Sequence, residues 1–128
     1  MRDQTKDRRR GRGRRGEWLA GLLLRLKGYR ILARNWRCAL GEIDIVAEQR
    51  SCIVFVEVKT RASRSAGSPE EAVTRAKRER LVRLGQAYLG QLRGRARAAR
   101  FDVIAVESGW PWPKVRHIRD AFRADGLV

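Results

Sequence analysis

Two apolar runs in the middle of the chain, Gly41–Ala47 and Ile53–Val58, are separated by a short polar segment. Both runs are rich in Ile and Val, which are typical of strands buried in a sheet. The only polar patch between them is Glu48–Ser51, and a turn at Arg50 and Ser51 would join the runs as an antiparallel hairpin. The pattern predicts a hairpin inside the protein core.

Apolar periodicity and the residues typical of helix starts and ends predict the other elements. A Leu-rich helix over Glu17–Lys27 ends at Gly28, and a second helix begins at the Ser-Pro-Glu-Glu segment from Ser68, breaks near Thr74 and ends at about Leu92. Its expected inner face comprises Val73, Ala76, Lys77, Leu81, Leu84, Ala87 and Tyr88. Further strands are expected at Tyr29–Trp36, Arg100–Glu107 and Lys114–Ile118. A hairpin followed by a helical crossover into another strand predicts an α/β fold, with a mixed central sheet flanked by helices.

Charged residues interrupt the predicted hairpin at alternate positions. Glu42 and Asp44 face one side of the first strand, and Glu57 and Lys59 share a face of the second. A turn at residues 50–51 sets Asp44 opposite Glu57 and Glu42 opposite Lys59. Directly opposed side chains lie roughly 5 Å apart at Cβ, where like charges destabilise a sheet. A positive group is therefore expected between the two carboxylates.

Acidic oxygen donors in this arrangement suit a hard divalent cation such as Mg²⁺. Lys59 would lie one pleat beyond the metal, where an ammonium group orients a water molecule or neutralises a phosphate. The alternative is an edge hairpin in which Glu42 and Lys59 form a solvated ion pair while Asp44 and Glu57 are merely exposed. Solvated faces rarely interrupt runs as apolar as Ile53–Val58, so the metal site is favoured.

Five sequence blocks in chain order resemble a known family. They are GRRGEWLAGLLLRLKGYRILARNWR, GEIDIVA, VFVEVKTR, RFDVIAV and DAF, and together they cover about Gly13 to Phe122. An Asp on one strand and Glu-x-Lys on the next is similar to the PD-(D/E)xK nuclease superfamily, which cuts nucleic acid phosphodiesters with Mg²⁺. The ordered blocks more closely resemble the small bacterial YraN-like family, itself similar to archaeal Holliday-junction resolvases.

The resemblance implies a restriction-endonuclease-like core and assigns roles to the hairpin residues. It implies that Asp44 and Glu57 bind Mg²⁺ or Mn²⁺, that the carbonyl of Val58 adds a ligand and that Lys59 assists the attacking water. The chain departs from the superfamily motif in having Ile43 where a Pro precedes the Asp. Because Pro would contribute no ligand, this departure counts little against the assignment.

Glu17 is the fourth acidic residue that the resemblance implicates. In resolvase-like members an acidic residue of the first helix faces the same site, and Glu17 occupies that position. Glu17, Ala20 and Leu24 form one helical stripe, which is compatible with an inward-facing carboxylate. The alternative is a helix-start carboxylate that interacts with the helix dipole.

Composition points to one domain and a polyanionic partner. The 128 residues carry a formal net charge of +16, with a pI near 11.5, and such a surface attracts nucleic acid through counterion release. We expect residues 16–128 to form a single endonuclease-like domain. No run approaches the roughly 20 apolar residues of a spanning helix and the N-terminus lacks a signal peptide's apolar core, so we expect a cytoplasmic protein without membrane contact.

Basic residues concentrate in two regions. Residues 1–15 hold eight Lys or Arg against two Asp, and we interpret them as a disordered tail that contacts DNA, serves as a solubilising arm or reflects an overextended translation start. Residues 75–100 hold nine basic residues against Glu79 alone, which predicts a phosphate-tracking surface or an ordinary solvated helix face. Lys77 reaches the scissile phosphate or extends along the core edge. The expected nucleic-acid contacts are Lys77, Arg61, Arg75 and Arg78, with Arg75 and Arg78 facing outward.

The sequence thus favours a metal-dependent endonuclease acting on structured or branched DNA, the substrate shape following from the resemblance alone. A non-catalytic DNA- or RNA-binding protein that retains the fold is the alternative, and a structural partner in a larger complex is a third interpretation. A resolvase-like activity would call for a homodimer. Trp110 and Trp112 stack on an unpaired base, or cover a core edge or partner.

Overall fold

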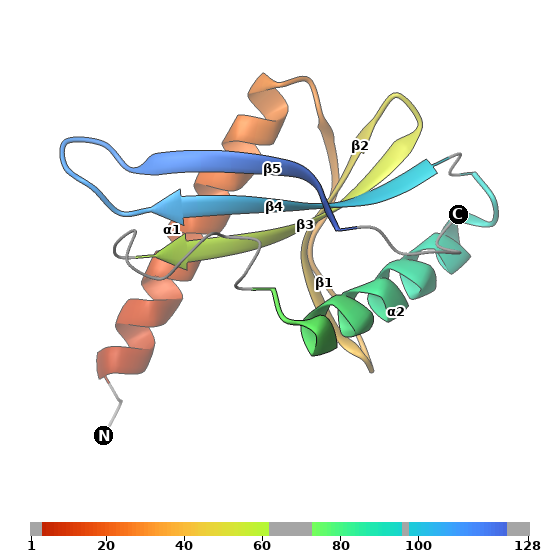
Figure 1. Cartoon of the computed structure of the whole chain (residues 1–128), viewed down its shortest axis with the longest axis horizontal. Helices are drawn as coiled ribbons and strands as arrows, with labels where there is room; N and C mark the ends of the chain where they lie inside the picture. The colour runs from red at the N-terminus through yellow and green to blue at the C-terminus, as the bar shows by residue number, and fades with distance from the viewer. Residues whose placement is uncertain (1–3, 62–72, 96–97, 123–128) are drawn as a thin grey trace.

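One five-stranded sheet lies between two helices (Figure 1). The computed structural model describes residues 4–61, 73–95 and 98–122, and the side chains of those ranges from residue 13 onward. In chain order the elements are α1 (Gln4–Leu26), β1 (Arg30–Cys38), β2 (Gly41–Gln49), β3 (Cys52–Arg61), α2 (Arg75–Leu92), β4 (Ala98–Glu107) and β5 (Lys114–Phe122).

The strands follow the chain order β1-β2-β3-β4-β5 across the sheet. Neighbouring strands are antiparallel except β3 and β4, which are parallel. A parallel connection needs a crossover, and α2 supplies it. The predicted α/β fold with a mixed, helix-flanked sheet is confirmed, and it is consistent with a restriction-endonuclease-like core.

The central hairpin of β2 and β3 has the predicted turn and register. Arg50 and Ser51 both adopt positive φ, 51° and 66°, as a two-residue turn matched to the twist of antiparallel strands requires. The pairs run from Gln49↔Cys52 to Ile45↔Val56. Had the hairpin slipped by one residue, its apolar side chains would have changed faces, so the burial of both sets specifies this register.

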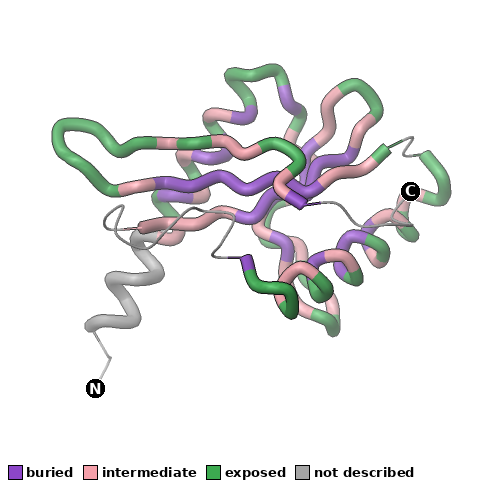
Figure 2. The backbone as a smooth tube through the Cα atoms, viewed as in Figure 1, coloured by how far each residue is buried: buried purple, intermediate pink, exposed green. Residues whose placement is uncertain are grey.

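Two apolar cores lie on opposite faces of the sheet (Figure 2). The core under α1 contains Ala20 and Leu24 with Ile45, Ala47, Val54, Val56, Ile104 and Val106 of the sheet. The core under α2 contains Leu81, Leu84 and Tyr88 with Val46, Ile53, Phe55, Phe101 and Val103. Because strand residues alternate between the faces, β3 and β4 are apolar on both, which explains their nearly continuous hydrophobic sequence.

Helix α1 is longer than predicted. It begins at Gln4 rather than at Glu17, so its backbone includes most of the segment interpreted as a basic tail. Arg, Lys and Gln are good helix formers, and the glycines of this segment weaken a helix by only about 1 kcal/mol each. Ala20 and Leu24 are fully buried, which confirms the inner stripe that also includes Glu17.

Helix α2 begins at the predicted break. Thr74 caps it, its hydroxyl accepting a hydrogen bond from the Lys77 amide at 3.3 Å; the capping motif expected at Ser68–Glu71 lies outside the described residues. Leu81 and Leu84 are buried as predicted, but Ala76 is exposed. The spacing explains the difference, since Lys77 is four residues before Leu81 and shares its face whereas Ala76 is five before it.

Strand β5 extends to Phe122, four residues beyond its predicted end at Ile118. Phe122 is buried and stacks on Phe101, with ring centroids 4.7 Å apart. Within the described residues, neither helix is long and apolar enough to cross a bilayer.

Candidate metal and nucleic-acid site

The candidate site lies where β2 and β3 stop pairing. The ladder ends at Ile45↔Val56, and beyond it the Val58 N–H donates to Asp44 Oδ2 at 2.8 Å. Had the register continued, that N–H would have faced the backbone of Ile43. The Asp44 carboxylate therefore takes the place of a backbone carbonyl as acceptor for the Val58 N–H. We call the point where β2 and β3 separate the fork.

The surroundings of Asp44 disfavour its charged form. Burial and the neighbouring Glu57 carboxylate raise the pKa of Asp44 from 3.8 to about 7, against the opposing effect of the Val58 hydrogen bond. Glu17 and Glu42 add to the rise in the pKa of Asp44. Four carboxylates thus place more negative charge at the fork than its solvation supports, and a cation there would relieve the repulsion.

Two lysines partly supply the missing positive charge. Lys77 Nζ lies 2.5 Å from Glu57 Oε1, and Lys59 Nζ lies 3.7 Å from the same oxygen. Glu57 is only 9% exposed. Lys77 comes from the first turn of α2, so the helix cap at Thr74 and the inner stripe of α2 together position an ammonium group over the hairpin.

The two lysines differ in how tightly they hold a proton. Burial lowers the pKa of Lys59, and the neighbouring Lys77 lowers it further, although Glu57 and Asp44 act in the other direction. Burial alone would also lower the pKa of Lys77, but its hydrogen bond and charge interaction with Glu57 outweigh that effect and raise it. Lys77 is therefore the permanent cation of the pair, and Lys59 is the one that gives up a proton more readily.

Glu17 faces the same region from α1. Burial raises the pKa of Glu17, a hydrogen bond from Asn35 lowers it, and Glu42 raises it again. With its amide nitrogen turned toward the carboxylates, Asn35 donates to Glu17 at 3.2 Å and to Glu42 at 2.7 Å. Asn35 was not predicted, because its partners lie on two other elements. Since α1 begins at Gln4, Glu17 is not a helix-start carboxylate.

The alternative edge hairpin is wrong. Glu42 Oε2 accepts a hydrogen bond from Arg37 Nε at 3.0 Å rather than pairing with Lys59. Lys59 instead pairs with Glu57, which is buried. The charged face of the hairpin is therefore a convergent polar cluster and not a solvated edge.

The donor set is chemically suited to a hard divalent cation. Asp44 and Glu57 offer carboxylate oxygens, and Mg²⁺ binds through one or two carboxylates while keeping several waters. Burial, and after it the Glu57 carboxylate, raises the pKa of Asp44, and a nearby cation would act in the opposite direction. In the described part of the chain, however, no three His, Cys, Asp or Glu side chains gather closely enough to hold a metal. Metal binding would thus require Glu57 to loosen its contact with Lys77.

The three arginines predicted to contact nucleic acid lie in different surroundings. Arg75 is exposed as expected and pairs with Glu79 at 3.4 Å. Arg78 does not face outward, because its guanidinium lies over the Phe122 ring at 5.5 Å and its Nε donates to a backbone carbonyl. Arg61 is partly buried at the end of β3, where its carbonyl accepts the Ser108 N–H at 2.8 Å.

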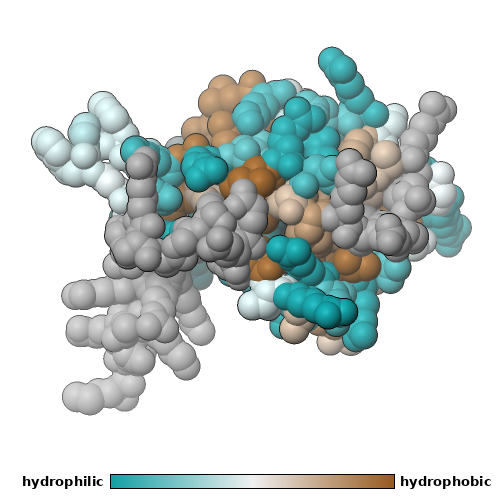
Figure 3. All heavy atoms as spheres, viewed as in Figure 1, coloured by the Kyte–Doolittle hydropathy of each residue, from teal (hydrophilic) through white to brown (hydrophobic). Residues whose placement is uncertain are grey.

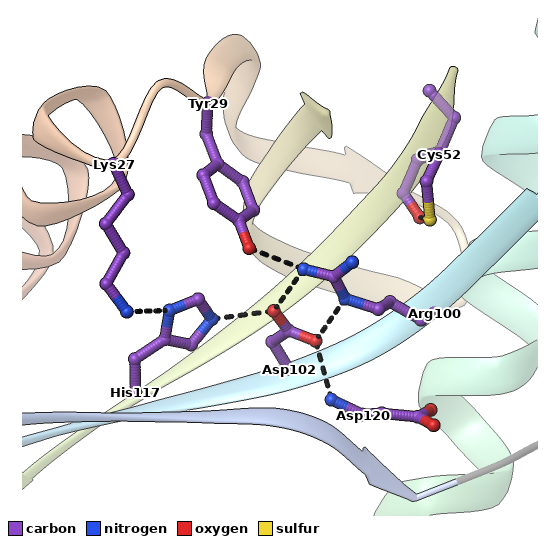
Figure 4. A network of polar contacts seen from close by, with 8 residues as sticks. Lys27, Tyr29, Cys52, Arg100, Asp102, His117 and Asp120 are labelled. Atoms are coloured by element: carbon purple, nitrogen blue, oxygen red, sulfur yellow. Dashed lines mark hydrogen bonds and ion pairs between the residues drawn. The ribbon is translucent and has the colours of Figure 1, made fainter. Parts of the chain in front are cut away.

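A second polar cluster surrounds Asp102, whose carboxylate is fully buried (Figure 4). One oxygen accepts from Arg100 Nε at 3.0 Å and from the Asp120 N–H at 2.9 Å, and the other contacts His117 Nε2 at 2.6 Å. Burial alone would raise the pKa of Asp102, but the hydrogen bonds from His117, Arg100 and the Asp120 backbone outweigh it and lower the pKa. The sequence signal that could have revealed this cluster is an Asp inside the apolar run FDVIAV.

Hydrogen bonds of the Asp102 cluster connect separate elements of the fold. Lys27 Nζ lies 2.9 Å from His117 Nδ1, and Arg100 also donates to the Tyr29 hydroxyl at 2.5 Å. A Lys ammonium can only donate, so His117 accepts at Nδ1 and donates from Nε2 to Asp102. The junction of α1 and β1 is thereby joined to β4 and β5, which is a structural role.

The fold and the first cluster define an α/β protein in which carboxylates and lysines converge at the fork of a buried hairpin. The chain belongs to the Uncharacterised protein family UPF0102, whose sequence profile matches residues 16–106. The family-level part of the resemblance is thereby confirmed.

Similar proteins come from several bacteria. A UPF0102 protein of Moorella thermoacetica is 56% identical over 98 residues, covering 77% of this chain and 82% of the relative. A UPF0102 protein of Symbiobacterium thermophilum is 48% identical over 113 residues, covering 88% and 96%. Among solved structures, Pyrococcus furiosus SfsA in complex with Ca²⁺ is similar over 78% of this chain and 58% of that chain, with 14% identity and a TM-score of 0.37.

Proposed function

We propose that this protein is a metal-dependent endonuclease of the PD-(D/E)xK superfamily that hydrolyses phosphodiesters of structured or branched DNA. The observation that carries the proposal is the convergence of the Asp44 and Glu57 carboxylates at the hairpin fork, with Lys59 paired to Glu57. Burial together with the neighbouring Glu57 carboxylate raises the pKa of Asp44, and a bound cation would offset the resulting cost of its charged form. Perturbed carboxyl groups of this kind are common in catalytic sites.

Binding alone would not account for the acidic residues. Affinity for nucleic acid comes from Lys and Arg, and a carboxylate beside a phosphate repels it. The chain is strongly basic, with a net charge of +16, yet it concentrates carboxylates at one fork. Acidic groups in such a protein are explained when a cation lies between them and the phosphate.

Each residue of the cluster has a distinct role in this proposal. Asp44, Glu57 and the carbonyl of Val58 would hold the ion, and Mg²⁺ would supply a more acidic bound water and a polarised phosphoryl oxygen. Lys59, with its lowered pKa, orients the water and exchanges a proton with it. Lys77 keeps its charge and neutralises the phosphate once Glu57 no longer engages it.

Other residues position the substrate. Glu17, next to Asn35, completes the acidic surroundings from α1. Exposed Arg75 lies two residues from Lys77 in the same helix and would contact the phosphate backbone. Arg61 at the end of β3 and Arg78 are further candidates for this contact.

The test is a cleavage assay with Mg²⁺ or Mn²⁺ on duplex, single-stranded, flap and four-way DNA, with RNA as a comparison. Asp44→Asn, Glu57→Gln and Lys59→Ala should each abolish cleavage and leave binding largely intact, because the metal and the activated water act on the reacting phosphate. Glu48→Gln is the matched control, since Glu48 lies at the turn end of the same hairpin, opposite Ile53. Full activity in EDTA, or in Lys59→Ala, would overturn the proposal.

The contact between Lys77 and Glu57 favours a second candidate, a non-catalytic DNA- or RNA-binding protein. Lys77 and Lys59 already compensate Glu57 without a metal. This candidate predicts tight binding, no cleavage of any substrate and no stabilisation by Mn²⁺. The oligomeric state should be measured alongside, because a four-way junction presents two equivalent strands and a homodimer would support that substrate.

A further inference from the structure

A cavity of about 280 Å³ opens on the α1 side of the sheet, at the carboxyl ends of the parallel strands β3 and β4. Its walls are formed by Arg15, Gly16 and Leu19 of α1, by Thr60 and Val106 of the sheet, and by Ser108, Gly109 and Pro113 of the segment joining β4 to β5. Apolar side chains line its sides, and two hydroxyls and a guanidinium add polar groups. This combination is typical of pockets that bind small ligands.

The cavity and the acidic cluster share two backbone segments. In α1, Gly16 lines the cavity while its neighbour Glu17 faces the carboxylates. In β3, Thr60 lines the cavity while its neighbour Lys59 pairs with Glu57. Adjacent residues of a strand point to opposite faces, so Thr60 and Lys59 approach the two places from opposite sides of β3. Beyond Val56 the strand β3 has no partner residue in β2, and a bound chain would pass from one place to the other around this edge.

Gly16 permits this arrangement. A Cβ atom at Gly16 would collide with Thr60 Oγ1, so only glycine lets α1 lie this close to β3. The contact brings Arg15 to the cavity mouth and Glu17 to the cluster.

Two tryptophans extend from the loop that forms one wall. Trp110 is 95% exposed and Trp112 is 77% exposed, and both lie between the cavity-lining Gly109 and Pro113. The loop projects beyond the sheet at the left of Figure 1. Exposed aromatic rings next to a basic pocket are the usual platform for unpaired bases.

We propose that this cavity binds one unpaired nucleobase of a strand that passes around the free edge of β3 to the acidic cluster. The cavity equals about nine water volumes at roughly 30 Å³ each, and a nucleobase has a similar number of non-hydrogen atoms. The Thr60 and Ser108 hydroxyls can each donate or accept a hydrogen bond to base edges, and Arg15 neutralises the adjoining phosphate.

A base in a duplex is stacked and paired on both sides, so only an unpaired or extruded base can enter such a cavity. The inference deepens the proposed function, on which it rests, by naming the substrate class. That class is DNA with an unpaired nucleotide beside the cleaved bond, such as a flap, a gap or a branch point.

The test measures binding in EDTA, where cleavage is not required. Two gapped DNA substrates are compared, one with a base and one with an abasic residue at the unpaired position. Wild-type protein should prefer the base by about fivefold to a hundredfold, the effect of one stacked base. The double variant Trp110→Ala/Trp112→Ala and the cavity-filling variant Ser108→Phe should each reduce the preference to near one and leave duplex binding unchanged.

Trp18→Ala is the matched control. Trp18 is an α1 tryptophan that is 62% exposed and does not line the cavity, so this variant should keep the wild-type preference. A preference near one in wild-type protein, or an unchanged preference in the double tryptophan variant, overturns the inference. If wild-type protein shows no base preference but cleaves DNA, the cavity assignment is wrong and the proposed nuclease activity stands. If it shows the base preference but cleaves no DNA, the cavity assignment stands and the proposed nuclease activity is wrong.

Discussion

At the scale of single residues, Asp44 is held between opposing influences. The Val58 N–H favours the charged form of Asp44, whereas burial and the Glu57 carboxylate favour the neutral form. Burial and Glu57 outweigh the hydrogen bond, and the pKa of Asp44 therefore rises to about 7. A structural carboxylate of this kind would ordinarily have a lowered pKa, as Asp102 has. The contrast separates a carboxyl group whose charged form is stabilised by its hydrogen bonds from one whose charged form is disfavoured by its surroundings.

The raised pKa of Asp44 predicts a pH-dependent stability in metal-free buffer. Folding contributes stability from this group below its unfolded pKa near 4, and that stability is lost as the pH rises through about 7. Asp44→Asn keeps an acceptor for the Val58 N–H but carries no charge. The variant should therefore melt several degrees above wild type at pH 8, with a smaller difference at pH 5.

Thermal melts of both proteins at the two pH values, with and without Mn²⁺, check this prediction. Metal bound only by the folded state stabilises it by about 2.7 kcal/mol at a hundredfold excess over Kd, so Mn²⁺ should reverse the order at pH 8. Glu48→Gln, at the turn end of the hairpin, serves as the control and should follow wild type. Equal Mn²⁺ shifts in wild type and Asp44→Asn would show that Asp44 is not a ligand.

At the scale of elements, the hairpin was the most predictable part. Apolar residues on both strands specified its register, and Arg50 and Ser51 marked its turn, so Asp44, Glu57 and Lys59 could be placed on one face from sequence alone. The start of α1 was not predictable, because an Arg-rich, Gly-punctuated segment has no apolar stripe. The partners of Asp102 were also missed, since they come from elements whose mutual approach depends on the whole sheet.

Helix α2 makes a testable contribution through Lys77. Lys77→Met should destabilise the metal-free protein by roughly 1–3 kcal/mol, because a largely buried Glu57 loses its nearest hydrogen-bonding partner. Mn²⁺ should recover more stability in this variant than in wild type, as the cation no longer competes with an ammonium. Denaturant melts with EDTA or Mn²⁺ measure both effects.

Arg75→Met is the control for the same helix, because Arg75 forms an exposed pair with Glu79 and should change stability by less than about 1 kcal/mol. Equal losses in the two variants would mean that Lys77 acts only through the general charge of the helix.

At the scale of the whole molecule, positive charge is the dominant feature. Among the coloured residues of the face seen in Figure 3, hydrophilic side chains are widespread and apolar patches lie between them. A net charge of +16 draws a polyanion toward the protein from any direction, whereas recognition of a particular structure needs the cluster and the cavity. Affinity and selectivity should therefore be separable.

Deleting residues 1–12 tests that separation. The segment carries six Lys or Arg and two Asp, and the deletion keeps Arg15 and Gly16 at the cavity. Its loss should weaken DNA binding and reduce the slope of log K against log salt by about 0.9 per lost phosphate contact. The order of preference among DNA structures should not change. A constant slope would show that the segment does not contact DNA, and an altered preference would make it a selectivity element.

The Asp102 cluster also determines where the protein can be divided. The family profile ends at residue 106, but His117 and the Asp120 N–H, which compensate the buried Asp102 carboxylate, lie beyond that boundary. A fragment ending there would keep an anion in its core with Arg100 as the sole remaining partner among these contacts, and leaving a buried polar group without a hydrogen-bonding partner typically costs about 1–3 kcal/mol, and more for a charged group. The smallest portion able to fold is therefore longer than the portion by which the family is recognised.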